Sequence, residues 1–443
     1  MSEIWLTMTA SDLGRAIGRG EIDPVALTRT YLDAAKAHPM SDRIYARMTE
    51  GRAMAEAEAA SERARLGLRR SLLDGVPISW KDLFDTAGVA TESGSALLKD
   101  RVPDSDAEVL RNATAAGLVC LGKTHMSELA FSGLGLNPVT ATPPCVNDYE
   151  AVAGGSSSGA ATSVAFGLAP GAIGSDTGGS VRIPAAWNDL VGLKTTLGRV
   201  SVEGSVPLCA RFDTVGPLCR SVEDAAQILA ALEGATPIDL KGATLEKTRL
   251  MILETAAMDD IREAPLKGFE RAVGRLESAG ATIERGEVPE LEEALSLSAV
   301  LFATEAYAYW QDVIEANPGL MFAEILTRFR SGADVLARDY LQAWNRLEEI
   351  RKIWADITAG FDAVILPSSP ILPPNTERLM TDSDYYITEN LLSLRNTRIG
   401  NLMGLAGLTL PTGIPSAGIM FLSSPNSEER LLRLGAAAEA AIS

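Results

Sequence analysis

Histidine is almost absent from this chain, whose 443 residues include only two, His38 and His125. His38 precedes a proline, which indicates the end of a helix. A Ser-His-Asp arrangement would therefore depend on His125, and no G-x-S-x-G elbow accompanies it. The four cysteines are not spaced as C-x-x-C pairs, so we expect no metal site. We also expect no organic cofactor.

Basic residues are in the minority: 40 Lys and Arg face 58 Asp and Glu, for a formal net charge of −18. This balance disfavours binding to a nucleic-acid backbone, which requires basic patches. No apolar run approaches the ~20 residues of a transmembrane helix, and the first residues lack the charged-then-apolar pattern of a signal segment. We therefore predict no nucleic-acid partner, no membrane association and a cytoplasmic location.

Aromatic residues are also few, at 5% of the chain against 46% hydrophobic residues in total. Ala-rich segments with helical propensity, such as 51–67 and 107–117, alternate with apolar segments typical of strands, such as 75–81 and 118–123. This alternation predicts an α/β fold with a largely buried sheet. No break in composition marks a linker, so we expect a single large domain, 1–443.

Helix-capping signals and irregular segments complete the local prediction. Asp23 before Pro24, and Ser221 with a closing Gly234, are typical of helix ends. Most of 289–358 is predicted to be helical and 368–394 irregular. Residues 131–153 are rich in Gly, Pro, Thr and Asn, so we expect a long loop, which is usually functional.

Lys81, Ser156 and Ser180 are the candidate catalytic residues. They lie in GVPISWKDLFDTAG (75–88), AGGSSSGAATSVAFG (153–167) and GSDTGGSVRIPAAW (174–187). A lysine among apolar neighbours loses its proton more easily and can serve as a base without histidine. Asp82 would oppose this effect, but on a strand it should face the other side from Lys81.

These segments, together with RFDTVGPLCRSVEDAAQIL (211–229) and NLMGLAGLTLPTG (401–413), resemble the amidase signature family of serine amidohydrolases. The resemblance is strong from about 70 to 235 and weak beyond. It implies an α/β fold with a mixed central sheet covered by helices on both faces. The chain would then comprise an N-terminal helical segment (1–70), a signature core (71–235) and a variable half with a cover over the substrate pocket (236–443).

The same resemblance implies hydrolysis of a small-molecule carboxamide through an acyl-enzyme on Ser180. Ser156, joined to Gly155 by a cis peptide bond, would relay protons between Ser180 and a neutral Lys81. The Gly-rich turn before the helix would form an oxyanion hole from the backbone N–H groups of Thr177, Gly178, Gly179 and Ser180. Asp176 and Arg182 would hold this loop.

Substrate contacts are assigned to Met126, Phe131 and Arg211. Arg211 stands where the family usually has a small polar residue, so it is a candidate for recognising a substrate carboxylate. We prefer the alternative, a surface arginine paired with an acid. Other departures, at His125 and 187–189, leave the three catalytic positions intact and the substrate open.

Two other functions remain open from the sequence. The chain could be the glutaminase subunit of a tRNA-dependent amidotransferase, which has the same triad but works with partner subunits. It could also be a binding module that keeps the Gly/Ser-rich loop without turnover. The leaving group and the oligomeric state, with a homodimer as one option, are not determined by these patterns.

Overall fold

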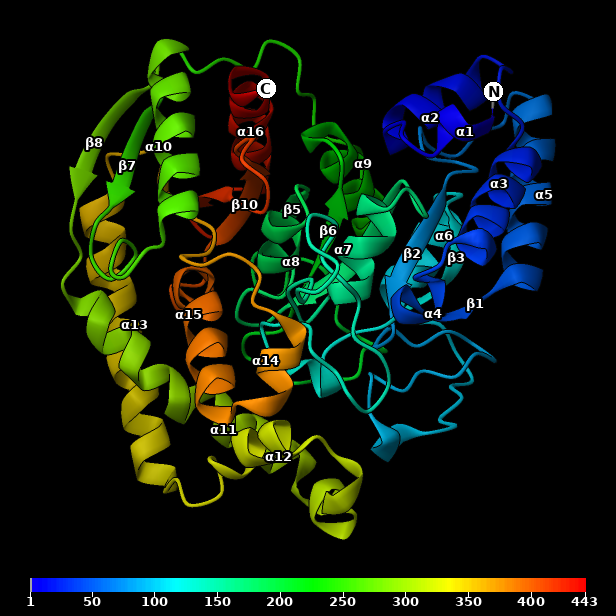
Figure 1. Ribbon diagram of the computed structural model, residues 1–443. Helices are drawn as coiled ribbons and strands as arrows, with labels where there is room; N and C mark the ends of the chain where they lie inside the picture. The colour runs from blue at the N-terminus through cyan, green and yellow to red at the C-terminus, as the bar shows by residue number, and fades with distance from the viewer. Residues whose placement is uncertain (1) are drawn as a thin grey trace.

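The computed structural model describes residues 2–443 and is built around one mixed sheet of eleven strands (Figure 1). In the order in which they lie side by side, the strands are β1 (Tyr45–Met48), β3 (Val119–Thr124), β2 (Pro77–Lys81), β4 (Gly171–Asp176), β6 (Thr214–Cys219), β5 (Val191–Lys194), β10 (Ala406–Pro411), β11 (Gly418–Ser423), β9 (Ala363–Pro367), β7 (Arg249–Leu253) and β8 (Thr282–Gly286). β2 runs parallel to β3 and β4, and β7 to β8 and β9, whereas the other pairs are antiparallel.

Helices cover both faces of this sheet, as the sequence predicted (Figure 1). On one face, α9 (Val222–Glu233), α16 (Glu428–Ile442) and α10 (Glu263–Ser278) pack on β6, β10 and β11. On the other face, α7 (Ser158–Ala165) packs on β4, α8 (Arg182–Trp187) on β5 and β10, and α15 (Ser383–Leu402) lies over α8. The strands of the signature segments are therefore enclosed, and their side chains are buried.

The N-terminal part of the chain is mostly helical. Its helices are α1 (Ser2–Trp5), α2 (Ala10–Gly18), α3 (Pro24–Ala37), α4 (Ser41–Ile44) and α5 (Glu50–Arg65), and α6 (Glu108–Ala115) follows between β2 and β3. The predicted caps are confirmed: the Asp23 carboxylate accepts a hydrogen bond from the Ala26 N–H at 3.0 Å, and Gly234 ends α9 in a left-handed conformation. Such caps satisfy backbone groups that a helix leaves unpaired at its ends.

The prediction that 289–358 is mostly helical is confirmed by α11 (Glu290–Ala316), α12 (Ala323–Arg330) and α13 (Ala337–Thr358). α11 contacts α12, α13 and α15, so these helices form one layer beside the signature core (Figure 1). Within residues 2–443, no helix combines the length and the apolar character that crossing a membrane requires.

The prediction that 368–394 is irregular is wrong, because α14 (Thr376–Thr381) and most of α15 lie there. The α15 sequence is rich in Asn, Ser and Thr, which have low helix propensity. Several of these residues are nevertheless buried, and they hydrogen-bond to loops of the core instead of facing solvent. Tertiary contacts outweigh local propensity here, and they make α15 a wall of the candidate site.

Candidate active site

Lys81 is the last residue of β2 and is fully buried. Its Nζ donates hydrogen bonds to Ser156 Oγ at 2.6 Å and to Ser175 Oγ at 2.8 Å. Ser175 comes from β4, the parallel neighbour of β2. Burial lowers the pKa of Lys81 to about 7, although the Asp176 and Asp213 carboxylates act in the opposite direction. A large fraction of Lys81 is therefore neutral near pH 7 and able to accept a proton.

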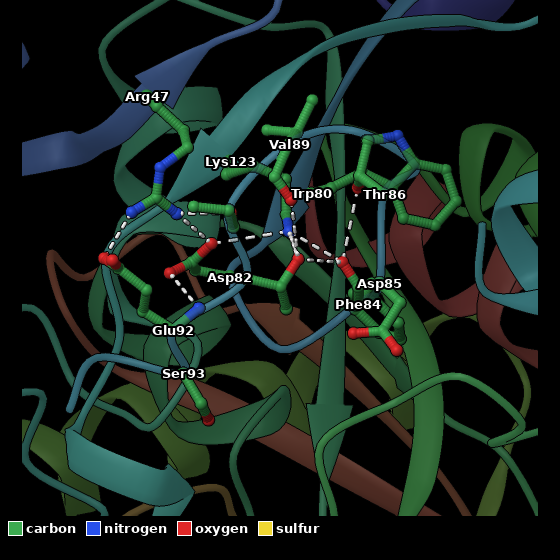
Figure 2. Close-up of polar contacts among 12 residues, drawn as sticks. Arg47, Trp80, Asp82, Phe84, Asp85, Thr86, Val89, Glu92, Ser93 and Lys123 are labelled. Carbon is green, nitrogen blue, oxygen red and sulfur yellow. Dashed lines mark hydrogen bonds and ion pairs between the residues drawn. The ribbon is translucent and has the colours of Figure 1, made fainter. Parts of the chain in front are cut away.

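Asp82 pairs with Arg47 and Lys123 (Figure 2) and not with Lys81, in agreement with the prediction from strand geometry. Its carboxylate accepts a hydrogen bond from Arg47 Nη1 at 2.6 Å and lies 3.4 Å from Lys123 Nζ. The same carboxylate accepts a hydrogen bond from the Glu92 N–H at 3.2 Å. The Asp82 charge is thus neutralised on the far side of the strand and does not pair with the Lys81 amine.

Ser156 follows a cis peptide bond from Gly155, as predicted. Its side chain is fully buried, and its carbonyl accepts a hydrogen bond from the Ser127 N–H at 3.1 Å. The next N–H, that of Ser157, donates to the Ser180 carbonyl at 3.2 Å. This bond holds the two serine segments side by side at the start of α7.

Ser180 is 4% exposed and lines a cavity together with Phe131, Thr177, Gly178, Leu394 and two arginines. Its hydroxyl has no hydrogen-bond partner among the described residues, Ser156 included. Catalytic hydrogen bonds are often long in unliganded enzymes and tighten once substrate is bound. The structure therefore brings Lys81 and Ser156 into contact and places Ser180 beside a cavity with its hydroxyl free.

Asp176 and Arg182 form a buried ion pair that organises the turn before Ser180. Arg182 Nη2 donates to Asp176 Oδ1 at 2.9 Å, and Asn401 of α15 donates to the same oxygen at 2.8 Å. Burial alone would raise the pKa of the Asp176 carboxyl, but the Arg182 charge and these hydrogen bonds hold that pKa well below its ordinary value. Because Asp176 stays charged, it also accepts the N–H of Gly179 at 2.9 Å and fixes the loop.

The N–H groups of this loop are divided between two tasks. That of Gly179 is occupied by Asp176, whereas those of Thr177, Gly178 and Ser180 have no partner within residues 2–443. Gly179 has a φ of +136°, and a Cβ there would collide with the Thr397 hydroxyl. Of the four predicted oxyanion donors, three are therefore free, and Gly179 is required for the shape of the loop.

Comparison with known proteins identifies the family of the chain. The family model described as Amidase matches residues 26–432. The chain belongs to the amidase signature family. Members of this family are hydrolases that act on C–N bonds, and the three segments that carry Lys81, Ser156 and Ser180 are its signature.

Individual members of the family match along nearly the whole chain. The 2-amino-5-chloromuconic acid deaminase of Comamonas testosteroni is 34% identical, over 96% of this chain and 94% of that protein. A glutamyl-tRNA(Gln) amidotransferase subunit from Roseiflexus sp. (strain RS-1) is 32% identical, over 97% of this chain and 95% of that protein. A crystal structure of an amidase superposes with a TM-score of 0.87 at 29% identity, covering 98% of this chain and 99% of that one.

Several residues of this amidase-family site were not identified from the sequence. Ser175 is the second acceptor of the Lys81 amine, and Thr397 of α15 donates to the Gly178 carbonyl at 2.8 Å. Asp213 accepts a hydrogen bond from Thr177 Oγ1 at 2.6 Å, and its burial raises its pKa to about 6. Asp213 lies in the segment 211–229, which resembles the family, so that motif could have identified it. No sequence pattern indicates that Thr397 contacts the core.

The three predicted substrate contacts lie in different places. Phe131 lines the Ser180 cavity. Met126 is fully buried and does not line that cavity, and its Sδ accepts a hydrogen bond from Ser93 Oγ at 3.7 Å. Arg211 lines a separate cavity with Arg351 and packs 5.0 Å from the centre of the Trp344 ring. The structure thus brings only Phe131 to the candidate nucleophile.

Proposed function

We propose that this chain hydrolyses the C–N bond of a small-molecule carboxamide through an acyl-enzyme on Ser180. The observation that supports this most directly is the buried Lys81 amine, whose pKa is about 7 and which lies 2.6 Å from Ser156 Oγ. A buried lysine with such a pKa beside a serine hydroxyl is suited to general-base catalysis.

In the acylation step, neutral Lys81 accepts the Ser156 proton while Ser156 accepts the Ser180 proton. Ser180 Oγ forms a bond to the amide carbon, and the negative charge on the carbonyl oxygen is stabilised by free N–H groups of the 177–180 loop. The tetrahedral intermediate then breaks its C–N bond. The proton held by Lys81 returns through Ser156 to the leaving nitrogen, which departs as ammonia or an amine.

Deacylation repeats the relay with water. Water loses a proton through Ser156 to Lys81, attacks the ester carbon and releases the carboxylic acid, and Ser180 recovers its proton. The Ser175 hydroxyl, the second acceptor of the Lys81 amine, keeps Nζ in place through both steps.

One alternative is supported by the comparisons. The Roseiflexus relative is named as a subunit of an amidotransferase, and it covers 97% of this chain at 32% identity. A glutaminase subunit of that kind would depend on partner proteins, whereas a free-standing hydrolase would not. Activity of the isolated chain therefore separates the two functions.

We expect the purified chain alone to release ammonia from at least one primary carboxamide in a panel of aliphatic, aromatic and carboxylate-bearing amides. Ammonia is measured with a coupled glutamate dehydrogenase assay. L-glutamine serves as the comparison substrate, because an amidotransferase subunit should favour it. Ammonia release from glutamine alone, and only after partner subunits are added, would contradict the proposal in favour of the amidotransferase.

The activity should also rise with pH through the neutral range. Burial lowers the pKa of Lys81 to about 7, and only the neutral amine can accept a proton, so kcat/KM is expected to fall about tenfold per pH unit below that value. Above pH 8 it should reach a plateau. The measurement is a kcat/KM profile from about pH 5.5 to 9.5 with the coupling enzyme in excess, and a profile that is flat across pH 6–8 would contradict the assigned base.

A further inference from the structure

Two arginines lie in the same cavity as Ser180. Arg328 comes from α12 and Arg398 from α15, and both line the cavity that Ser180 and Gly178 also line. Both also line an adjoining cavity with Phe131, Phe302 and Ser298. The candidate nucleophile therefore faces a space whose walls carry two guanidinium groups.

Neither guanidinium is paired with an acid. Arg398 Nη1 donates one hydrogen bond, to Ser298 Oγ at 3.2 Å. Arg328 Nη1 is buried without a hydrogen-bond partner in the described chain, and its guanidinium lies 4.5 Å from the centre of the Phe131 ring. No Asp or Glu occurs among the described residues that line either cavity.

Acids are not scarce in this chain, in which they outnumber bases by 58 to 40, yet none pairs with these two arginines in the described residues. Arg330, two residues beyond Arg328 on the same helix, makes a two-pronged ion pair with Glu315 at 2.9 and 2.7 Å. Arg328 and Arg398 are both partly buried. A cation that is partly withdrawn from water without a partner is costly, and two close together repel each other. Burial, followed by the Arg328 charge, lowers the pKa of Arg398 to about 9, which reports the same unfavourable environment.

An anion between the two guanidiniums would remove this cost. A planar guanidinium binds a carboxylate through two parallel N–H···O bonds, and such charge-assisted bonds are strong when shielded from water. The Ser180 loop, which lines the same cavity, offers its free N–H groups to a carbonyl. The lining of this cavity thus combines groups that can bind a carboxylate with groups that can bind an amide carbonyl.

We propose that Arg328 and Arg398 bind a carboxylate of the substrate, so that the amide cleaved at Ser180 is the monoamide of a dicarboxylic acid. This rests on the function proposed above. The proposal also predicts that amino-acid amides are poor substrates. Their ammonium group would lie beside two cations, in a cavity whose described lining carries no acid. Arg211, the carboxylate-binding candidate from the sequence, lines another cavity and is not needed here.

Three five-carbon amides that differ in charge test the proposal: glutaramate (anionic), glutaramide (neutral) and L-glutamine (zwitterionic), with malonamate and succinamate to vary the length. We expect kcat/KM to favour the best monoamide over its neutral diamide by roughly 10- to 100-fold, the value of a charge-assisted hydrogen bond. Arg328→Gln and Arg398→Gln should each remove most of this preference, by lowering kcat/KM for the monoamide far more than for the diamide. Arg330→Gln, on the exposed face of α12, is the matched control. It should change neither the preference for the monoamide nor the hydrolysis of the diamide.

Binding measured without turnover keeps this proposal separate from the catalytic one. Calorimetric titration of the Ser180→Ala variant with malonate, succinate and glutarate should show binding that Arg328→Gln weakens roughly 10-fold or more, with Arg328→Lys in between. Binding of dicarboxylates without hydrolysis of any amide would overturn the proposed function and leave the anion site standing. Hydrolysis with an equal preference for acid and diamide, or no binding of any of the three dicarboxylates, would overturn the anion site.

Discussion

Ser180→Ala is expected to lower kcat by roughly 10⁴- to 10⁶-fold, because no other group can form the acyl-enzyme. The same change should abolish covalent labelling by a fluorophosphonate, which reacts with activated serines. Intact-protein mass spectrometry measures the label, and ammonia release measures kcat. Binding of substrate should persist, since Ser180 is small and its hydroxyl has no hydrogen-bond partner in the described chain to lose.

Ser132→Ala is the matched control for this change. Ser132 lines the same cavity, but its hydroxyl is bonded to Asn390 Oδ1 at 3.1 Å and to the Tyr386 hydroxyl at 3.2 Å. Ser132 is not bonded to a lysine that could activate it, so this variant should still be labelled. Retained labelling and turnover in Ser180→Ala would exclude Ser180 as the nucleophile, whereas the absence of both in the wild type would support the binding-module alternative.

The signature core was predictable because its chemistry is local in sequence. Gly179 is needed where the loop has a positive φ, Asp176 is the last residue of β4, and Lys81 ends a buried strand, so short motifs specify most of the arrangement around them. The same locality made the orientation of Asp82 predictable, since side chains alternate along a strand.

The other wall of the cavity was not predictable in this way. Thr397 and Arg398 lie on α15, whose first half was predicted to be irregular, and they reach the core only through tertiary packing. Arg328 lies on α12, and nothing in its spacing relates it to Ser180. Asp176, Arg182 and Gly179, which shape the nucleophile's loop, are thus predictable from motifs. The two arginines that we propose select the substrate come from segments whose position depends on the complete fold.

Lys81→Met is expected to reduce kcat/KM by roughly 10²- to 10⁴-fold, the usual contribution of a general base. The variant should also lose the rise in activity around pH 7, because the group that titrates there is gone. Methionine occupies a similar volume, so the buried site should stay filled. A variant with normal turnover and an unchanged pH profile would show that Lys81 is not the base.

Measuring the stability of Lys81→Met shows whether its loss of activity comes from loss of the base or from unfolding. The pKa of Lys81 is about 7 in the folded chain against an ordinary value of 10.5, so between these two pH values the unfolded state binds an extra proton. The wild type therefore becomes more stable, relative to Lys81→Met, as pH rises from about 7 to 10. Near pH 7, replacing Lys81 by Met should change the free energy of unfolding little. Chemical denaturation of both proteins at about pH 7 and pH 9.5 measures this difference.

Lys123→Met is the matched control, because Lys123 is another buried lysine, on the neighbouring strand β3 (Figure 2). Its Nζ donates to the Phe84 carbonyl at 2.6 Å and to Thr91 Oγ1 at 2.9 Å, and it lies 3.4 Å from Asp82. Removing it leaves these buried acceptors without their donor, so it should lower the free energy of unfolding by roughly 3 kcal/mol while the folded fraction keeps its pH profile. We thus expect the Lys81 variant to lose activity and the Lys123 variant to lose stability. This pair of outcomes would show that contact with Ser156, and not burial alone, makes Lys81 the base.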